Sequence, residues 1–179
     1  RRPQRDQRQG SWLAGWGVRT VSPRPGDRSP LAACPRLRMV ATDYDPDMVS
    51  TAQDTVAPFK DRGSVERADA AELPFADGRF DLVLSAAMLH HAIAWEKVLA
   101  EVSRVLRPGG RLIGDDLVDT ALIRLMHFGD KPETRLLRPA QLKTELDRLQ
   151  LTDVRMRCGT GGLVVRFAAT KPERGATPA

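Results

Sequence analysis

The stretch ERADAAELPFADGRFDLVLSAAMLHH, residues 66–91, decides the fold. Its first residues belong to a short strand-like segment, SVERAD (64–69), and turn-forming residues follow. RFDLVLSA (79–86) then has the continuous apolar run of a strand that is buried on both faces. Strands of that kind are typical of a parallel sheet that helices cover from both sides, so this stretch predicts part of such a sheet.

The segments on either side continue the same alternation of strand and helix. RLRMVATD (36–43) predicts a strand, after which Asp45 is a natural N-cap and Pro46 suits the first position of a helix. Apolar residues at helical spacing predict a helix from Trp95 to Leu106, which RPGG ends. RLIGDDLV (111–118) predicts a fourth strand.

The C-terminal part adds a helix and two strands. Leu142, Leu146 and Leu149 have helical spacing, and LTDVRMRC (151–158) and GLVVRFAATK (162–171) read as strands joined through a glycine-rich turn. The sequence therefore predicts an α/β protein with a doubly wound, mostly parallel sheet and an antiparallel strand near the C-terminus.

Polar residues follow the predicted strands at their carboxyl ends, where ligands bind in parallel sheets. They are Asp43, Asp69, Ser85-Ala86 and Asp115-Asp116, one group for each strand. A carboxylate at such a place can accept two hydrogen bonds from the hydroxyl groups of a ribose. We therefore interpret Asp43 as a ligand-binding residue, and Asp45 as a helix cap.

The charge of the chain is unevenly distributed. Residues 1–38 hold nine Arg and two Asp, a balance of +7, whereas residues 39–179 hold 19 basic and 21 acidic residues, a balance of −2. The basic head has no aromatic residues interleaved with its arginines, which favours a disordered tail over a nucleic-acid-binding arm.

Other classes of protein receive no support. No run approaches the roughly 20 apolar residues of a membrane span, and no secretory signal opens the chain. Two cysteines and three histidines are too few and too widely spaced for a structural zinc site. We expect no metal and a reducing cytoplasm as the compartment.

Three segments together resemble the class I S-adenosylmethionine-dependent methyltransferases, in the small-molecule branch that includes quinone-biosynthesis C-methyltransferases. They are MVATDYDPDMVSTA (39–52), ADAAELPFADGRFDLVLSAAMLHH (68–91) and LAEVSRVLRPGGRLIGDD (99–116). The resemblance implies a Rossmann-like fold, S-adenosyl-L-methionine as cofactor and a small molecule as methyl acceptor.

The resemblance also implies roles for individual residues. Asp43 would hold the ribose and Tyr44 would lie beside the adenosine, while Asp69 and Ala70 would bind the adenine through a side chain and the backbone. Ser85 and Ala86 would flank the methionine end. Leu73-Pro74-Phe75 would contribute local packing only.

The acceptor side is less specific. His90 and His91 stand where a base could act, although a histidine pair there also fits a polar surface. The segment ALIRLMHFGDKPE (121–133) offers Leu122, Leu125, Met126 and Phe128 as an apolar cap over the acceptor. A helix that packs its own apolar face on the sheet would account for it equally well.

One motif of the family is missing or unrecognisable. Its first strand and glycine-rich loop should precede Asp43 by about 20 residues, but VRTVSPRPGDRSPLAA (18–33) contains Gly26 alone, and Gly15 and Gly17 do not follow an apolar strand. We therefore expect residues 1–30 to be a basic head that is disordered or translated out of frame. Residues 31–171 would form the domain and residues 172–179 a tail.

Two origins of this head remain open, a frameshift upstream of Leu31 or a truncated, decayed gene copy. They leave a second hypothesis for function beside methyl transfer. In it the chain is a non-catalytic Rossmann-like remnant whose Arg-rich head contacts acidic partners.

Overall fold

Seven strands form a single sheet in the part of the chain that the structure describes. The computed structural model describes residues 11–16, 31, 34–59, 61–126 and 134–173. The strands are β1 (Ser11–Trp16), β2 (Arg38–Asp43), β3 (Gly63–Arg67), β4 (Phe80–Ala86), β5 (Leu106–Leu117), β6 (Thr152–Gly159) and β7 (Val164–Thr170), in the order β3-β2-β1-β4-β5-β7-β6. The described helices are α2 (Pro46–Val56), α3 (Trp95–Val105), α4 (Ala121–Met126) and α5 (Pro139–Arg148).

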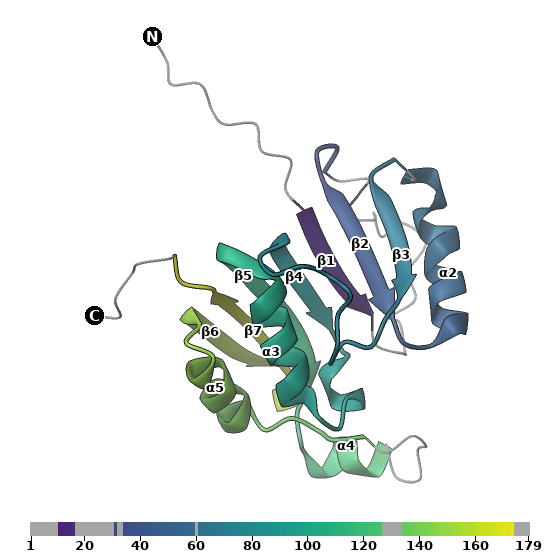
Figure 1. Cartoon of the computed structure of the whole chain (residues 1–179). Helices are drawn as coiled ribbons and strands as arrows, with labels where there is room; N and C mark the ends of the chain where they lie inside the picture. The colour runs from purple at the N-terminus through teal and green to yellow at the C-terminus, as the bar shows by residue number, and fades with distance from the viewer. Residues whose placement is uncertain (1–10, 17–30, 32–33, 60, 127–133, 174–179) are drawn as a thin grey trace.

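The sheet has the predicted directions. Strands β1 to β5 pair in parallel, and β7 enters antiparallel between β5 and β6 (Figure 1). The order of the parallel strands reverses at β1, as in doubly wound folds that bind ligands at this point. The predicted fold class is therefore confirmed, as is the C-terminal hairpin, whose turn is the short 3₁₀ helix Thr160–Gly162.

The sequence analysis left the first strand as missing or unrecognisable, and the first of these alternatives was wrong. Ser11–Trp16 form β1, which lies between β2 and β4 in the middle of the sheet. This strand belongs to the segment that we expected to be a disordered head. The expected absence of a glycine-rich loop concerns residues 17–30, which lie outside the described residues, and it stays a prediction.

Helices pack on both faces of the sheet, because side chains alternate along each strand. On one face Met39 of β2 packs with Val56 of α2, and Leu84 of β4 packs against the same cluster. On the opposite face Val83 of β4 joins the larger core, to which α3 and α5 contribute. The largest fully buried side chain, Trp95, begins α3 in that core.

Helix α3 and strand β5 meet one residue earlier than predicted. The helix ends at Val105, since Leu106 already has the extended φ and ψ of −68° and 134°. Strand β5 therefore includes Arg-Pro-Gly-Gly, which the sequence analysis placed in a helix stop. The register against β4 shifts there between Phe80 and Leu82, so the extra residues form a bulge. Gly110 fits this bulge because a Cβ atom would lie 2.7 Å from the carbonyl oxygen of Arg107.

The start of α2 agrees with its predicted cap. Asp45 has extended φ and ψ, and its Oδ1 accepts a hydrogen bond of 2.9 Å from the backbone N–H of Asp47. Pro46 occupies the first turn, where its missing N–H costs nothing. The helix that follows β2 thus begins directly after Asp43 and Tyr44.

We predict that Asp45→Ala lowers the free energy of unfolding by about 1 kcal/mol, because the first turn of α2 loses its side-chain acceptor. Urea denaturation followed by circular dichroism measures this change. Asp54→Ala, at an exposed position inside the same helix, is the matched control and should cost nothing. Equal losses in the two variants would contradict the capping role.

Candidate functional site

The carboxyl ends of the parallel strands bring the predicted site residues to one edge of the sheet. Gly15 of β1 pairs with Thr42 on one side and with Ser85 on the other, so these residues form a row across three strands. Asp43 and Ala86 follow one residue further along their strands. Neighbouring strands are about 4.8 Å apart, which separates Asp43 from Ala86 by roughly 10 Å with the end of β1 between them.

Two buried oxygen atoms at this edge have no hydrogen-bond partner among the described residues. They are Oδ2 of Asp43 and Oγ of Ser85, in side chains that are almost fully buried. The other carboxylate oxygen of Asp43, Oδ1, accepts a hydrogen bond of 2.9 Å from the N–H of Asp45. Buried polar groups without a partner are costly, which makes a ligand that supplies the partner a physical expectation here.

The environment of Asp43 opposes its ionisation. Burial raises the pKa of this carboxyl above its ordinary value, and the nearby charge of Asp45 acts in the same direction. Hydrogen bonds from the backbone of Asp45 and Tyr44 act against both effects. A hydroxyl donor at Oδ2 would stabilise the ionised form in the same way as these backbone donors.

Tyr44 lies just beyond β2 with 68% of its surface exposed. The guanidinium of Arg67, at the end of β3, lies 5.4 Å from the centre of the tyrosine ring, and its Nε donates to the carbonyl oxygen of Tyr44 over 3.0 Å. An exposed aromatic ring is thereby held at the edge that carries Asp43.

Asp69 and Ala70 form a tight turn after β3. Oδ1 of Asp69 accepts from the N–H of Ala71 over 2.8 Å, and the carbonyl oxygen of Asp69 accepts from Glu72 over 3.0 Å. Asp69 is exposed, whereas Ala70 lines a cavity of about 20 Å³ together with Thr42, Ser85 and Met88. A cavity of this size holds about one water molecule, so a nucleoside would lie over the strand ends and outside it.

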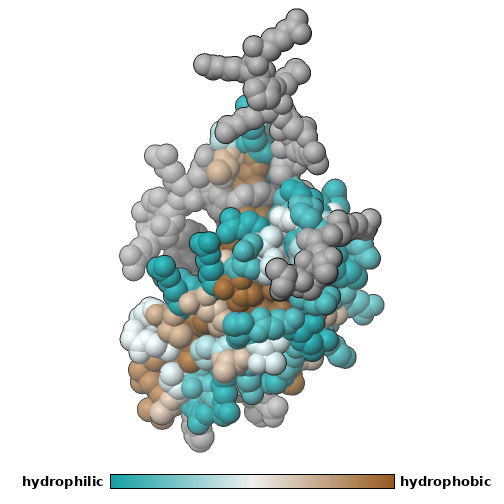
Figure 2. All heavy atoms as spheres, turned by 90° about the vertical axis from the view of Figure 1, so that its left-hand side faces the viewer, coloured by the Kyte–Doolittle hydropathy of each residue, from teal (hydrophilic) through white to brown (hydrophobic). Residues whose placement is uncertain are grey.

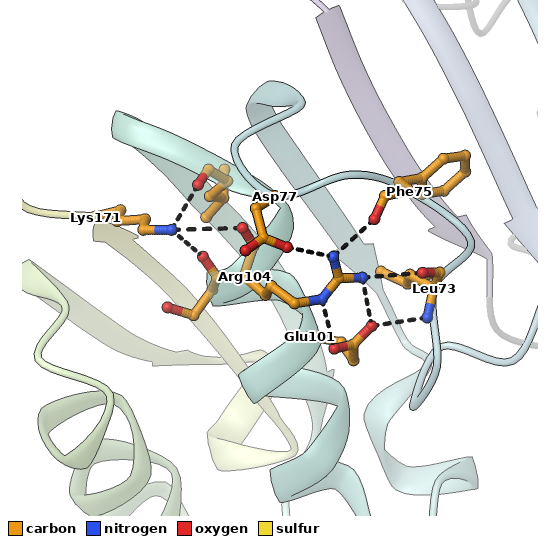
Figure 3. Close-up of polar contacts among 8 residues, drawn as sticks. Leu73, Phe75, Asp77, Glu101, Arg104 and Lys171 are labelled. Carbon is orange, nitrogen blue, oxygen red and sulfur yellow. Dashed lines mark hydrogen bonds and ion pairs between the residues drawn. The ribbon is translucent and has the colours of Figure 1, made fainter.

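A cluster of hydrogen bonds around Arg104 fixes the segment that follows this turn (Figure 3). Arg104 of α3 donates to both carboxylate oxygens of Glu101 and to the carbonyl oxygens of Leu73 and Phe75, over 2.7–2.9 Å. It also pairs with Asp77 at 2.7 Å. We call this group the Arg104 clamp. Because it holds the chain from Leu73 to Asp77 on α3, it limits the movement of the Asp69-Ala70 turn.

Leu73 and Phe75 also pack, as expected. Leu73 is buried in the larger core, and the ring of Phe75 meets that of Phe80 edge to face, with centroids 5.1 Å apart. The side chains of these residues pack in the core, and their carbonyl oxygens accept hydrogen bonds in the Arg104 clamp.

His90 has a carboxylate partner of the kind that orients a base. His90 is buried, and its Nδ1 lies 2.5 Å from Oδ1 of Asp116 at the end of β5. Asp116 also accepts from the N–H groups of Leu89 and Leu117, both over 2.7 Å. The His91 ring lies beside that of His90, with centroids 4.0 Å apart, and is half-buried.

The sequence analysis assigned no role to Asp116. Two features of the sequence could have indicated the contact. The His pair follows β4, and Asp116 lies near the end of the next predicted strand. Because β4 and β5 pair in parallel, their carboxyl ends are neighbours and bring His90 and Asp116 into contact.

Helix α4 presents apolar side chains to solvent. Leu122, Leu125 and Met126 are 52%, 73% and 67% exposed, while Ile123 is buried. These three residues therefore do not pack on the sheet, and the alternative of a helix packing its own apolar face holds for Ile123 only. Phe128 lies outside the described residues.

Metal binding and membrane crossing find no support in the part of the chain that the structure describes. Its His, Cys, Asp and Glu side chains form no group of three or more that could hold a metal ion. Its helices are all too short or too polar to cross a membrane.

Comparisons with known proteins point to one family. The family described as "Methyltransferase domain" matches residues 25–114, half of the chain. Methyltransferase GfsG of Streptomyces halstedii is 38% identical over 54% of this chain and 39% of the relative. The ubiquinone/menaquinone biosynthesis C-methyltransferase UbiE of Geobacter sulfurreducens is 33% identical over 57% of this chain and 42% of the relative.

A solved structure shares the fold. Phosphoethanolamine N-methyltransferase 2 of Haemonchus contortus, in complex with S-adenosyl-L-methionine, superposes with a TM-score of 0.73. The match covers 94% of this chain and 50% of that protein, at 16% identity. The chain belongs to the methyltransferase domain family and has the class I, S-adenosylmethionine-dependent fold. It spans about two fifths of the length of the two curated relatives.

We predict that Asp43→Asn is more stable than the parent chain at neutral pH. The pKa of Asp43 is raised in the folded state, so the folded chain binds the proton more tightly than the unfolded chain does. The stability of the parent chain therefore falls as pH rises from about 3.9, the ordinary aspartate value, through the folded pKa. An amide does not ionise and escapes this loss.

Urea denaturation of both chains between pH 3 and pH 7 tests this prediction. The stability difference should be largest at neutral pH and should close at the acid end of the range. A difference that is independent of pH would contradict the assigned cause.

Proposed function

We propose that this chain binds S-adenosyl-L-methionine at the carboxyl edge of β1–β4 and transfers its methyl group to a small-molecule acceptor. The observation that carries the proposal is the pair of buried, unpartnered oxygens, Oδ2 of Asp43 and Oγ of Ser85. Family membership supplies the cofactor class, and the relatives named above are themselves methyltransferases.

The donor set at this edge fits the parts of the cofactor. Oδ2 of Asp43 is an acceptor for a ribose hydroxyl, and the exposed Tyr44 ring lies where an adenosine would need an apolar neighbour. Asp69 can accept from the exocyclic amine of adenine, beside the backbone of Ala70. Ser85 Oγ, with Ala86, would meet the methionine end, about two strand spacings from Asp43.

The residues of the chain contribute position more than reactive groups. When bound, the cofactor supplies a methyl group on a positively charged sulfur. The sulfur is a good leaving group for an in-line displacement at the methyl carbon. The strand ends would hold the sulfur end near Ser85 and Ala86, so that an acceptor atom would approach from the side of β4 and β5. Alignment of the two reactants is the main part of such catalysis, and exclusion of water is secondary.

His90 is our candidate for the base, should the acceptor have to lose a proton. An ionised Asp116 beside Nδ1 favours the proton on that nitrogen and directs the basic lone pair to Nε2. We assign the proton transfer to His90 before His91, because the Nδ1 of His90 faces a carboxylate. The exposed side chains Leu122, Leu125 and Met126 would form the apolar cap over the acceptor.

We infer a reducing compartment, the cytoplasm, for this activity. Cys34 and Cys158 are both free and exposed, as thiols are where they are not driven into disulfides.

Asp43→Ala should weaken binding of S-adenosylhomocysteine at least tenfold. The ribose loses hydrogen bonds to a charged acceptor, each worth about 1.5–3 kcal/mol, and about 1.4 kcal/mol corresponds to one decade. Isothermal titration calorimetry on the purified chain measures the affinity.

Asp45→Ala is the control, because its carboxylate caps α2 and should leave the affinity unchanged. Equal binding by Asp43→Ala and the parent would remove the ribose assignment. A folded parent chain that binds neither S-adenosylmethionine nor S-adenosylhomocysteine would favour the non-catalytic remnant.

His90→Gln should lower kcat by about 10²–10⁴ on an acceptor whose hydroxyl group must lose its proton. His91→Gln is the matched control, and an unchanged kcat in His90→Gln would exclude the base role.

A further inference from the structure

A groove of about 580 Å³ lies over β4, β5, β7 and β6. Residues on one face of the sheet supply most of its lining: Leu84, Ala86, Ile113, Asp115, Arg155, Arg157, Arg166 and Ala168. Strand pairing puts them in rows, because Leu84 pairs with Ile113 and Ala86 with Asp115. Helix α2 packs further along the same face, against β2 and β3. The volume lies in the range of small-molecule sites.

The floor of the groove is apolar and one wall is cationic. Leu84, Ile113 and Ala168 contribute the floor from three neighbouring strands. A space-filling view from the side of β6 and α5 shows apolar residues gathered between polar ones on this part of the molecule (Figure 2). An apolar floor beside a cationic wall fits a ligand that has an apolar part and a negatively charged part.

Three arginines form the cationic wall, and their arrangement is unusual within the sheet. Arg157 of β6 pairs directly with Arg166 of β7, and Arg155 lies two residues before Arg157 on the same face. Like charges that face each other across two strands repel and destabilise the pair. On its other side Arg166 faces Asp115 of β5, which is the acidic residue in the groove lining.

Six other arginines of the domain have a carboxylate partner. Arg104, Arg107, Arg124, Arg135, Arg138 and Arg148 each form an ion pair with an Asp or Glu. Within the described residues, Arg155, Arg157 and Arg166 form none at salt-bridge distance, although Asp115 interacts with Arg166 electrostatically. The groove therefore carries three positive charges against one negative charge, and its three exposed guanidinium groups form no ion pair with the described part of the chain.

We infer that this groove binds the methyl acceptor, and that the acceptor is an elongated apolar molecule with a carboxylate or phosphate group. Guanidinium groups bind both anions through paired N–H donors. Its apolar body would lie on the floor formed by β4, β5 and β7. The end of the groove at Ala86 and Asp115 lies at the carboxyl ends of β4 and β5, the edge at which the proposed function places the methyl donor. This assignment as acceptor rests on the proposed function.

Titration of the isotope-labelled chain with octanoate, octyl phosphate and 1-octanol, followed by amide chemical shifts, tests the inference. The two anions should shift amides of β5, β6 and β7 and bind at least tenfold more tightly than octanol, because each anion gains charge-assisted hydrogen bonds. The tighter of the two identifies the anionic group. Their affinity should fall as salt rises.

Variants connect the binding to the arginines. Replacing Arg155, Arg157 and Arg166 together by Gln should weaken octanoate or octyl phosphate at least tenfold, and Asp115→Asn should strengthen it. Arg38→Gln changes an exposed arginine on β2, away from the groove, and should have no effect. Unchanged affinity in the triple variant, or octanol binding as tightly as the anions, would overturn the inference. Binding of a poly-glutamate peptide in place of both small anions would overturn it in favour of a protein partner.

S-adenosylhomocysteine separates this inference from the proposed function. Octanoate should bind equally well with and without it, since an acceptor and the cofactor must occupy the chain together. Displacement of octanoate by S-adenosylhomocysteine would make the groove part of the cofactor site and end the acceptor assignment. Intact octanoate binding with no S-adenosylhomocysteine binding would instead count against the cofactor site and leave the ligand class of the groove standing.

Discussion

The Arg104 clamp is the interaction on which the candidate cofactor site depends. One guanidinium joins α3 to a segment that begins 31 residues earlier in the chain, through a carboxylate and two backbone carbonyl groups. Lys171 reinforces the end of the same helix, because its Nζ donates to the carbonyl oxygens of Ser103 and Leu106 over 2.6 and 2.8 Å (Figure 3). A guanidinium can satisfy several acceptors in one plane, whereas an ammonium cannot reproduce that geometry. The clamp thereby turns an irregular loop into a fixed support for the Asp69-Ala70 turn.

The same edge of the sheet contains buried polar groups that lower the stability of the fold. Asp43 is buried with one oxygen unpartnered, its pKa is raised, and Ser85 keeps a buried hydroxyl without a partner among the described residues. None of these features stabilises the fold by itself. Groups of this kind persist in proteins where function requires them, and the clamp and the two cores supply the stability that offsets them. A ligand that donates hydrogen bonds to Asp43 and Ser85 would remove this unfavourable free energy and bind more tightly as a result.

Much of the fold was predictable because its signals are local. Continuous apolar runs mark β2 and β4, and a proline after a capping aspartate marks the start of α2. Strand β1 was missed because its short apolar run, Trp12-Leu13-Ala14, is followed by a glycine and stands between Arg-, Pro- and Gly-rich segments. Its place in the sheet comes from pairing with two distant strands, which no local pattern records. The candidate site also combines local and long-range features. Asp43 could be proposed from the sequence alone, because it stands at the end of a predicted strand. The contact of His90 with Asp116 and the arginine wall arise only when separate strands pair.

The central place of β1 has a consequence for how the chain folds. Trp12 pairs with Leu82 and Met39 on its two sides, so β1 lies between two strands that both follow it in the chain and are synthesised later. Until β4 exists, β1 has one neighbour, and an isolated pair of short parallel strands is weak. The two halves of the sheet therefore join late, through contacts between residues far apart in the chain, and contacts of this kind make folding slow. During that interval β2 and β4 each expose an unpaired edge to other chains.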